Sequence, residues 1–458
     1  MGFIATGVPN LDTILGGGLP EAYLVVISGG PGAGKTVLVQ QIASHFARHG
    51  GRVLYVTALS EPHSSLVAHL SGFTFFDRSL LGDRIKIVNV FPIARQGLGA
   101  VTSTIVRTIK DDKISLLIFD NFRSLRDIHA DEREVRAFSY ELAGTLSSIQ
   151  TSALFTSEFE MARAEDAPEV VIADGMIHLS SEWTGLRVRR TIEIVKLRGA
   201  GVLRGPHSFQ ISRAGIAVFP RPESAYTLPV GAPLKGKAAL GVPWLDDMLH
   251  GGLPLGSSTL VVGHPGAGKT ALNLHFAASG LRAGEPVVFV TITEAPEHLV
   301  AKAGRIGLDV REAFDGGLLK FLHYPITELD PDRLSWHIWS EVESLQARRV
   351  VIDGFTLLER AVGSERLPGF LTALFSHLRA NNVTVSVARS SNSAGSTLPS
   401  LGGLPVATIV DNIILLRTLE REGRLRRTAV VLKVRDGPHD HAVKEYTISA
   451  SGLQLEVG

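Results

Sequence analysis

Nearly the same 30-residue stretch occurs twice in the chain, and this duplication limits the possible folds more than any other feature. Residues 7–36 (GVPNLDTILGGGLPEAYLVVISGGPGAGKT) and 241–270 (GVPWLDDMLHGGLPLGSSTLVVGHPGAGKT) are identical at 17 of 30 positions. The run RRTIEIVKLR at 189–198 is similar to RRTAVVLKVR at 426–435, so the motifs of the two copies are separated by nearly the same number of residues. A repeat of this length indicates two whole domains rather than a solenoid of short units.

The boundary between the two domains is predicted from composition. A chain of 458 residues exceeds what one hydrophobic core usually serves. Residues 219–237 (FPRPESAYTLPVGAPLKGK) hold four prolines and several turn-forming residues, which is typical of a linker. We therefore expect a first domain at residues 1–228 and a second at residues 229–458.

The pattern within each copy predicts an α/β fold. In the first copy, short runs rich in Val, Ile and Leu alternate with longer segments of helical period, and these runs lie at 24–28, 53–57, 85–90, 116–120 and 153–157. Such near-continuous apolar strands imply a mainly parallel sheet covered by helices on both faces. Shorter strands separated by turns follow, and they predict an antiparallel extension that the second copy repeats from residue 411 onward.

Composition excludes several classes of protein. Apolar residues make up 45% of the chain and charged residues 20%, as in ordinary globular proteins. The formal net charge is +1, so any nucleic acid or anionic lipid would have to bind a local patch. The absence of cysteine excludes disulfides, and neither an export signal nor an apolar run of membrane-spanning length occurs. We expect a cytoplasmic protein that does not span a membrane.

Each copy contains a glycine-rich loop that follows an apolar run and opens a helical segment. The loops at 29–36 and 263–270 match the P-loop spacing, in which Gly is followed by four residues and then Gly-Lys-Thr. Glycines let backbone N–H groups surround phosphate oxygens, and the helix adds the positive end of its dipole. A glycine-rich turn without a ligand is the alternative, but two matches in the same context favour phosphate binding. The predicted nucleotide-binding residues are Gly30, Pro31, Gly32, Ala33, Gly34, Lys35, Thr36, His264, Pro265, Gly266, Ala267, Gly268, Lys269 and Thr270.

Four residues are predicted to hold Mg²⁺. The hydroxyls of Thr36 and Thr270 are expected to ligate the ion, while Lys35 and Lys269 reach the β- and γ-phosphates. Asp120 and Asp353 end apolar runs about 80 residues after their loops, where each can orient metal-bound water. An Asp at a strand end is more often a turn former, but the preceding P-loop favours the functional interpretation.

These motifs together resemble the KaiC family of RecA-type ATPases. The resemblance covers nearly the whole chain: two tandem domains each carry GVPxLDxxLxGGLP, PGAGKT, a strand-end Asp and a late KLRG or KVRDGPHD stretch. It implies two RecA-like P-loop NTPase domains in a double-ring homohexamer, with ATP between neighbouring subunits. It also implies that Lys196 and Arg198, and likewise Lys433 and Arg435, reach the phosphates of the next protomer. Solvated charges at a strand end are the alternative.

The sequence departs from the family at the catalytic carboxylates. In the family, two adjacent glutamates follow the second strand, and one of them activates the attacking group. The second domain has Thr293 and Glu294 there, so one glutamate remains. The first domain has Leu59 and Ser60, with Glu61 one residue late. We expect both domains to bind ATP, the first to hydrolyse it very slowly and the second to hydrolyse it slowly through Glu294. The alternative for Glu294 is a structural role, because the helix dipole favours an acidic residue at the start of a helix.

A second departure concerns self-phosphorylation. The clock member of the family phosphorylates an adjacent Ser-Thr pair, and the matching positions here are Ala407 and Thr408. Because alanine has no hydroxyl, Thr408 is the one candidate phosphoryl acceptor of this pair, and autokinase activity would act on it. The chain also ends soon after GLQLEVG, without the tail by which that member engages its activator, so a three-component oscillator is not expected.

The sequence is also compatible with two other functions. A nucleotide-dependent scaffold read by unidentified protein partners requires little hydrolysis. DNA recombination or repair is a further alternative, because both copies carry arginine clusters, at 187–190 and 424–427. The acidic loop SEFEMARAEDAPE at 157–169 argues against a nucleic-acid partner. His439 and His441 lack further ligands at metal-site spacing and indicate a surface turn.

Overall fold

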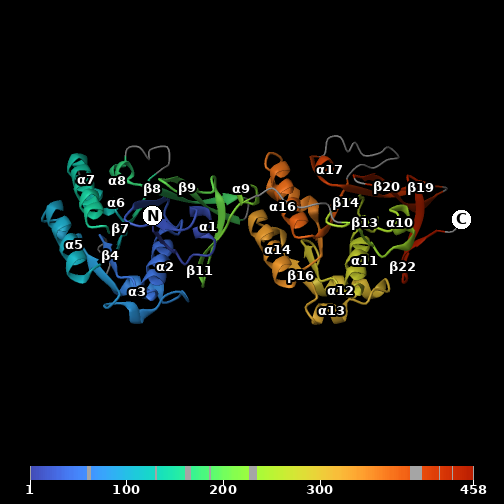
Figure 1. Cartoon of the computed structure of the whole chain (residues 1–458), viewed down its shortest axis with the longest axis horizontal. Coiled ribbons are helices and arrows are strands. Elements are labelled where there is room, and N and C mark those ends of the chain that lie inside the picture. Colours follow the sequence, from blue (N-terminus) through green and yellow to red (C-terminus); the bar gives the residue numbers. More distant parts are fainter. Residues whose placement is uncertain are drawn as a thin grey trace. The chain divides into compact units, whose positions relative to one another are not determined.

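The computed structural model describes residues 2–58, 63–128, 131–159, 167–184, 187–225, 235–391, 405–421, 423–435 and 437–456 (Figure 1). The chain divides into two compact units, Met1–Ser224 and Ala225–Gly458. The predicted boundary between residues 228 and 229 falls in the stretch 226–234, outside the described residues, and stays a prediction.

The described part of the first unit is built on a nine-stranded sheet. From one edge to the other its strands are β11 (Gly215–Phe219), β10 (His207–Ser212), β9 (Arg187–Leu197), β8 (Gly175–Thr184), β3 (Leu24–Gly29), β7 (Ser152–Ser157), β6 (Leu116–Phe119), β4 (Val53–Thr57) and β5 (Ile85–Asn89). The sheet is parallel from β8 to β5, and β9, β10 and β11 form the antiparallel extension. Strand β8 lies parallel to β3 and antiparallel to β9, so it joins the two parts.

The described part of the second unit repeats this sheet with the same strand order. Its strands are β16 (Leu319–His323), β15 (Val287–Thr291), β17 (Arg349–Asp353), β18 (Thr384–Ser390), β14 (Ser258–Gly263), β19 (Asn412–Arg421), β20 (Arg424–Val434), β21 (Lys444–Ser449) and β22 (Gly452–Leu455). A two-stranded ribbon precedes the sheet of each unit: β1 (Phe3–Ile4) with β2 (Leu19–Pro20), and β12 (Lys237–Ala238) with β13 (Leu253–Pro254). The predicted fold class, two tandem RecA-like α/β domains with antiparallel extensions, is confirmed.

Helices cover both faces of each sheet (Figure 1). Those of the first unit are α1 (Leu11–Leu15), α2 (Lys35–Arg48), α3 (His63–Leu70), α4 (Phe91–Ala94), α5 (Leu98–Asp112), α6 (Arg123–Ile128), α7 (Glu132–Ser148), α8 (Pro168–Ile172) and α9 (Pro222–Ala225). Those of the second are α10 (Pro243–Met248), α11 (Lys269–Arg282), α12 (Pro296–Arg305), α13 (Arg311–Asp315), α14 (Pro331–Leu345), α15 (Phe355–Val362), α16 (Leu367–Ala380) and α17 (Pro405–Ile409). Of the helices that the structure describes, none has the length and apolarity needed to cross a bilayer.

Alternate side chains of the central strands enter two separate cores. In β3, Val25 and Ile27 belong to the buried cluster that contains residues of α2, whereas Leu24 and Val26 belong to the cluster that contains residues of α5 and α7. This partition follows from the two-residue period of a strand. It explains why the central strands are largely apolar: every residue of β3, β4, β6 and β7 is buried, on both faces of the sheet. The glycine-rich loops and the strand-end residues Asp120 and Asp353 lie at the carboxyl ends of central strands of the two sheets.

Candidate functional site

The first glycine-rich loop connects β3 to α2. Gly34 immediately precedes the helix with φ of 108°, a left-handed conformation that glycine adopts without strain. Lys35, the first residue of α2, is 6% exposed, and its ammonium group donates hydrogen bonds to the carbonyl oxygens of Gly29 (2.8 Å) and Gly30 (2.9 Å). It also forms an ion pair of 3.2 Å with Glu158 Oε1. The lysine is thus held over the loop, with a carboxylate beside it.

The second loop, between β14 and α11, has the same backbone arrangement. Gly268 precedes the helix with φ of 97°, and the Lys269 ammonium donates to the carbonyl oxygens of Gly263 and His264, both at 2.9 Å. Burial lowers the pKa of Lys269 below its usual value, and the nearby charge of Asp353 partly opposes this effect. Among the described residues no carboxylate forms an ion pair with Lys269, which distinguishes it from Lys35.

In the second unit the structure brings the predicted metal residues together. Asp353 ends β17 and is 7% exposed, and the Thr270 hydroxyl donates a hydrogen bond of 2.8 Å to its Oδ2. Burial raises the pKa of Asp353, the Thr270 hydrogen bond opposes the rise, and the negative charge of Glu294 adds to it. A hydroxyl beside a buried strand-end carboxylate is the donor set that a P-loop Mg²⁺ requires. These residues therefore fit a divalent cation.

In the first unit the corresponding carboxylate has other partners. Asp120 follows β6 and is 7% exposed. Its Oδ2 accepts a short hydrogen bond from the Tyr55 hydroxyl, and its Oδ1 accepts another from the Thr156 hydroxyl. Thr36 is exposed, and it makes no hydrogen bond to Asp120. Thr36 and Asp120, both predicted to hold Mg²⁺, are therefore not joined by a hydrogen bond in the first unit, unlike Thr270 and Asp353 in the second.

Glu294 lies in the turn between β15 and α12. The hydroxyl of Thr291 donates to its carbonyl oxygen (2.7 Å), which fixes the backbone of the turn. The ammonium group of Lys302, from α12, donates to both carboxylate oxygens, at 2.7 and 2.6 Å. The negative charge of Glu294 contributes to the raised pKa of Asp353. The corresponding first-unit positions, Leu59, Ser60 and Glu61, lie outside the described residues.

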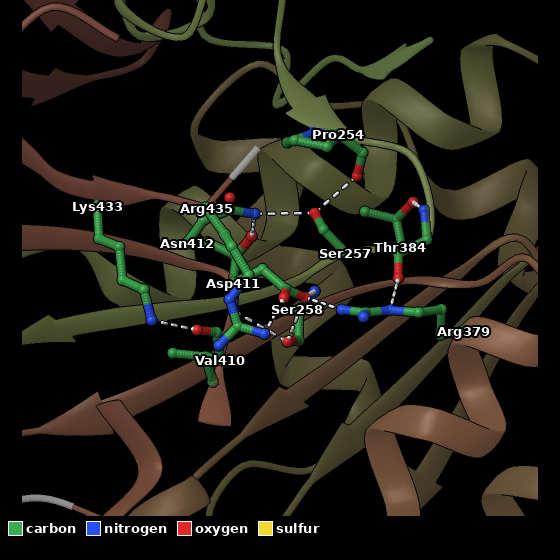
Figure 2. A network of polar contacts seen from close by, with 12 residues as sticks. Pro254, Ser257, Ser258, Arg379, Thr384, Val410, Asp411, Asn412, Lys433 and Arg435 are labelled. Carbon is green, nitrogen blue, oxygen red and sulfur yellow. Dashed lines mark hydrogen bonds and ion pairs between the residues drawn. The ribbon is translucent and has the colours of Figure 1, made fainter. Parts of the chain in front are cut away.

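Lys433 and Arg435, the predicted cations of the second unit, lie in a polar network around the buried carboxylate of Asp411 (Figure 2). Asp411, 2% exposed, accepts hydrogen bonds from the backbone N–H (2.9 Å) and hydroxyl (3.0 Å) of Ser258 and pairs with Arg379. Arg435 Nη1 lies 3.1 Å from Asp411 Oδ1. Although burial alone would raise it, the pKa of Asp411 is lowered by these donors from Ser258 and Arg379. Asp411 therefore stays charged and orients Arg435.

Backbone carbonyls of α17 and the residue after it hold the same two cations. Lys433 Nζ donates to the carbonyl oxygens of Ala407 (3.1 Å) and Val410 (2.7 Å), and Arg435 Nη2 donates to that of Thr408 (3.0 Å). Burial lowers the pKa of Lys433, and the adjacent positive charge of Arg435 lowers it further. The structure thus places the candidate acceptor Thr408 directly beside the predicted cation pair.

The first unit has a simpler version of this arrangement. Lys196 Nζ donates to the carbonyl oxygen of Ala173 (2.8 Å), and Arg198 Nη1 lies 3.4 Å from Asp174 Oδ1. The other carboxylate oxygen of Asp174 accepts from the Leu24 N–H (3.1 Å). Burial lowers the pKa of Lys196, and the charge of Arg198 adds to this effect.

Strand register places Lys196, Arg198, Lys433 and Arg435 at the end of the strands opposite to the glycine-rich loop of the same unit. Gly29, where that loop begins, pairs with Leu179, and Leu179 pairs with Ile192 of β9. Lys196 lies four residues further along β9, or about 13 Å at the usual rise of a strand, and Arg198 lies beyond it. The second unit repeats this register, since Gly263 pairs with Leu416 while Lys433 pairs with Ile413. Neither cation pair therefore faces the loop of its own unit.

Three charged residues near the loops were not singled out from the sequence. Arg427 Nε donates to the carbonyl oxygen of Gly266 (3.2 Å), and its place in the arginine-rich start of β20 was a signal that could have identified it. Glu158 and Lys302 carry no motif, and only the adjacency of strands and helices reveals them. Elsewhere the rings of His439 and His441 lie 4.4 Å apart, and within the described ranges no three acidic or histidine side chains gather as a metal site would require.

Comparisons with known proteins agree with this geometry. The sequence model of the family described as "ATPase: KaiC" matches residues 4–223 and again residues 238–456. The circadian clock oscillator protein KaiC of Picosynechococcus sp. is 27% identical over 468 residues, which cover 99% of this chain and 89% of the relative. In Synechocystis sp., the circadian clock oscillator protein KaiC 1 is 28% identical (99% and 88% covered) and the circadian clock protein KaiC3 is 27% identical (99% and 91% covered). Two family matches that together span nearly the whole chain show that it belongs to the KaiC family of tandem RecA-type ATPases.

Proposed function

We propose that the chain is an ATP-binding protein and slow ATPase of the cytoplasm that assembles into a double-ring homohexamer. Each glycine-rich loop holds the phosphates of one ATP, and Lys35 or Lys269 contacts the β- and γ-phosphates. Lys196 and Arg198 of an adjoining chain complete the first site, and Lys433 and Arg435 complete the second. ATP then lies at the subunit interfaces and links the chains together.

The placement of the late cations carries this proposal. Lys433 and Arg435 lie at the end of the strands opposite to the glycine-rich loop of their own unit, yet each is oriented by polar contacts. Preorganised, partly desolvated cations favour an anionic partner, because less conformational entropy is lost on binding. We therefore infer that the phosphates they bind belong to another molecule, and a copy of the same chain offers phosphates in its own loop.

In the second unit we expect slow hydrolysis. Mg²⁺ held by Thr270, with Asp353 orienting its water, would neutralise charge on the phosphates when bound. Glu294 supplies the only carboxylate at the position of the family's glutamate pair, and it orients the attacking water or accepts its proton. The pairing of Glu294 with Lys302 slows this step, since the contact must loosen before water can approach the carboxylate.

The position of Thr408 supports autokinase activity as an additional function. Its carbonyl oxygen accepts from Arg435, so its segment lies beside the cations proposed to bind the phosphates of the neighbouring chain. An exposed hydroxyl at this place can approach a γ-phosphate across the interface. Intact-mass analysis after incubation with ATP should show one added phosphate, and Thr408→Ala should abolish it.

The pairing of Lys302 with Glu294 also favours a second function, a nucleotide-dependent scaffold whose state is read by protein partners. Measurement of phosphate release distinguishes the slow ATPase from the scaffold. Slow turnover predicts release that Glu294→Gln reduces by about 10² to 10⁴, whereas a scaffold predicts release at background from both proteins, with assembly still dependent on ATP.

Native mass measurement tests assembly. The proposal predicts a particle of six chains with ATP, which loosens with Lys35→Ala or Lys196→Ala. A monomer whose mass does not respond to ATP, ADP or their removal would contradict it.

A further inference from the structure

Both carboxylate oxygens of Asp120 are engaged by hydroxyl groups from neighbouring strands. Tyr55 of β4 is 1% exposed, Thr156 of β7 is fully buried, and each donates a short hydrogen bond to one oxygen. Burial raises the pKa of Tyr55 well above its usual value, and the charge of Asp120 and the hydrogen bond to it raise it further, so the phenol keeps its proton and remains a donor. These contacts belong to the interior of the unit and are not surface contacts.

The second unit has neither hydroxyl. Tyr55 occupies the third position of β4, and Phe289 occupies the third position of β15. Thr156 lies beside Ile27 of β3, and the residue at that register of β18 is Ala388, beside Val261. The carboxylate of Asp353 instead accepts from the Thr270 hydroxyl at Oδ2 (2.8 Å) and from the Gly354 N–H at Oδ1 (3.1 Å), and neither donor comes from a neighbouring strand. The two units therefore differ at the residues that decide where the strand-end carboxylate is directed.

The lysine of the first loop also has a different partner. Lys35 forms an ion pair with Glu158, whose side chain is 25% exposed, whereas Lys269 has only backbone carbonyls as partners among the described residues. Register places Ser390 at the position of Glu158. Phosphate must displace this carboxylate from Lys35, while the second loop has none to displace.

We propose that the first site holds nucleotide without a divalent cation, with Tyr55 as the positioning residue that keeps Asp120 from serving a metal. This inference rests on the proposed nucleotide binding at the first loop. The hydroxyls of Tyr55 and Thr156 each use one lone pair on a different oxygen of Asp120 and hold the carboxylate toward the neighbouring strands, so metal-bound water must compete with them for the carboxylate. Without the Asp120 contact, Mg²⁺ adds little to the affinity. The first site then keeps its nucleotide as a structural ligand, and the second site carries the metal-dependent chemistry.

The test measures how Mg²⁺ changes nucleotide affinity at one site at a time. In the full chain carrying Lys269→Ala, the affinity for the fluorescent ADP analogue mant-ADP is measured in Mg²⁺ and in EDTA. We expect Mg²⁺ to change the Kd by less than about twofold, and to tighten it by about threefold or more once Tyr55→Phe is added, the equivalent of one modest hydrogen bond. Tyr140→Phe, which removes an exposed hydroxyl in the same unit, should leave the Kd ratio unchanged.

The reverse substitution in the second unit keeps the test valid if Tyr55→Phe impairs folding. In the full chain carrying Lys35→Ala, Mg²⁺ should tighten mant-ADP binding, and Phe289→Tyr should reduce this effect. Equal tightening by Mg²⁺ at both sites, with no response to Tyr55→Phe, would overturn the inference while leaving the proposed function intact. Absence of mant-ADP binding under every condition would overturn both.

Discussion

The ammonium group of Lys302 lies 2.7 and 2.6 Å from the two carboxylate oxygens of Glu294. This pair joins the turn after β15 to the body of α12, and it occupies the oxygens that would otherwise face water. Its side chains are 37% and 31% exposed, so solvent screens the attraction and the pair can open. The contact therefore restrains Glu294 without removing it from the site.

Replacing Lys302 tests this restraint. Lys302→Met keeps the length of the side chain and removes its charge, so it should raise phosphate release by about two- to fivefold, the rate equivalent of a screened pair worth up to about 1 kcal/mol. Lys320→Met, which removes the weaker pair of 3.8 Å with Glu341, serves as the matched control. A decrease with Lys302→Met would mean that the lysine contributes to the reaction directly.

The network around Asp411 should affect both stability and assembly. Asp411→Asn removes the charge that orients Arg379 and Arg435, and we expect it to lower the free energy of unfolding by about 1–3 kcal/mol. The two arginines are 48% and 43% exposed, which keeps the loss below that of a fully buried pair. Urea denaturation measures the loss, and exposed Asp247→Asn is the control. The same variant should loosen the ATP-dependent particle, because Arg435 is no longer oriented.

A buried histidine of the second unit predicts a pH dependence of stability. The Leu453 N–H donates to Nε2 of His275 (3.4 Å), so Nδ1 carries the proton that reaches the Gly241 carbonyl (3.1 Å), and the ring is neutral. Burial lowers the pKa of His275, and although the hydrogen bond to Gly241 opposes this, Arg282 lowers it further.

The sign of the effect follows from this lowered pKa. Because the histidine of the unfolded chain takes up a proton near its ordinary pKa of 6.5 and that of the folded chain does not, the contribution of His275 to stability is present above pH 6.5. It is lost as the pH falls below 6.5 toward the lower pKa of the folded state. Urea denaturation at about pH 7.5 and about pH 5.5 should show a smaller loss of stability for His275→Gln than for the parent chain. An equal loss in both proteins would exclude this contribution.

The fold could be predicted because the sequence patterns that determine it lie within short segments and occur in both copies of the repeat. Apolar runs gave the parallel strands, and the P-loop spacing identified the turn between β3 and α2, whose Lys35 lies over the loop. Motifs also assigned Thr270 and Asp353 to one predicted metal site, and in the structure a hydrogen bond joins the two side chains. These features depend on spacing along the chain, which a sequence displays directly.

The contacts of Asp120 could not be predicted in this way. Tyr55 and Thr156 reach it only because β6 lies between β4 and β7 in the sheet, and strand order is not visible in spacing. The ion pair of Lys35 with Glu158 likewise requires β7 to lie beside β3. Side chains that meet across strands depend on tertiary adjacency, and they are where the two units differ most.

The central claim is that each second-unit site is shared between two chains, and mixing two inactive variants tests it most directly. Lys269→Ala removes the lysine of the loop, and Arg435→Ala removes the cation offered to the neighbour. Each variant alone should lose phosphate release, whereas rings assembled from both together should recover part of it, because some interfaces then join an intact loop to an intact Arg435. If the mixture stays as inactive as the separate variants while forming mixed particles of six chains, the shared site is contradicted.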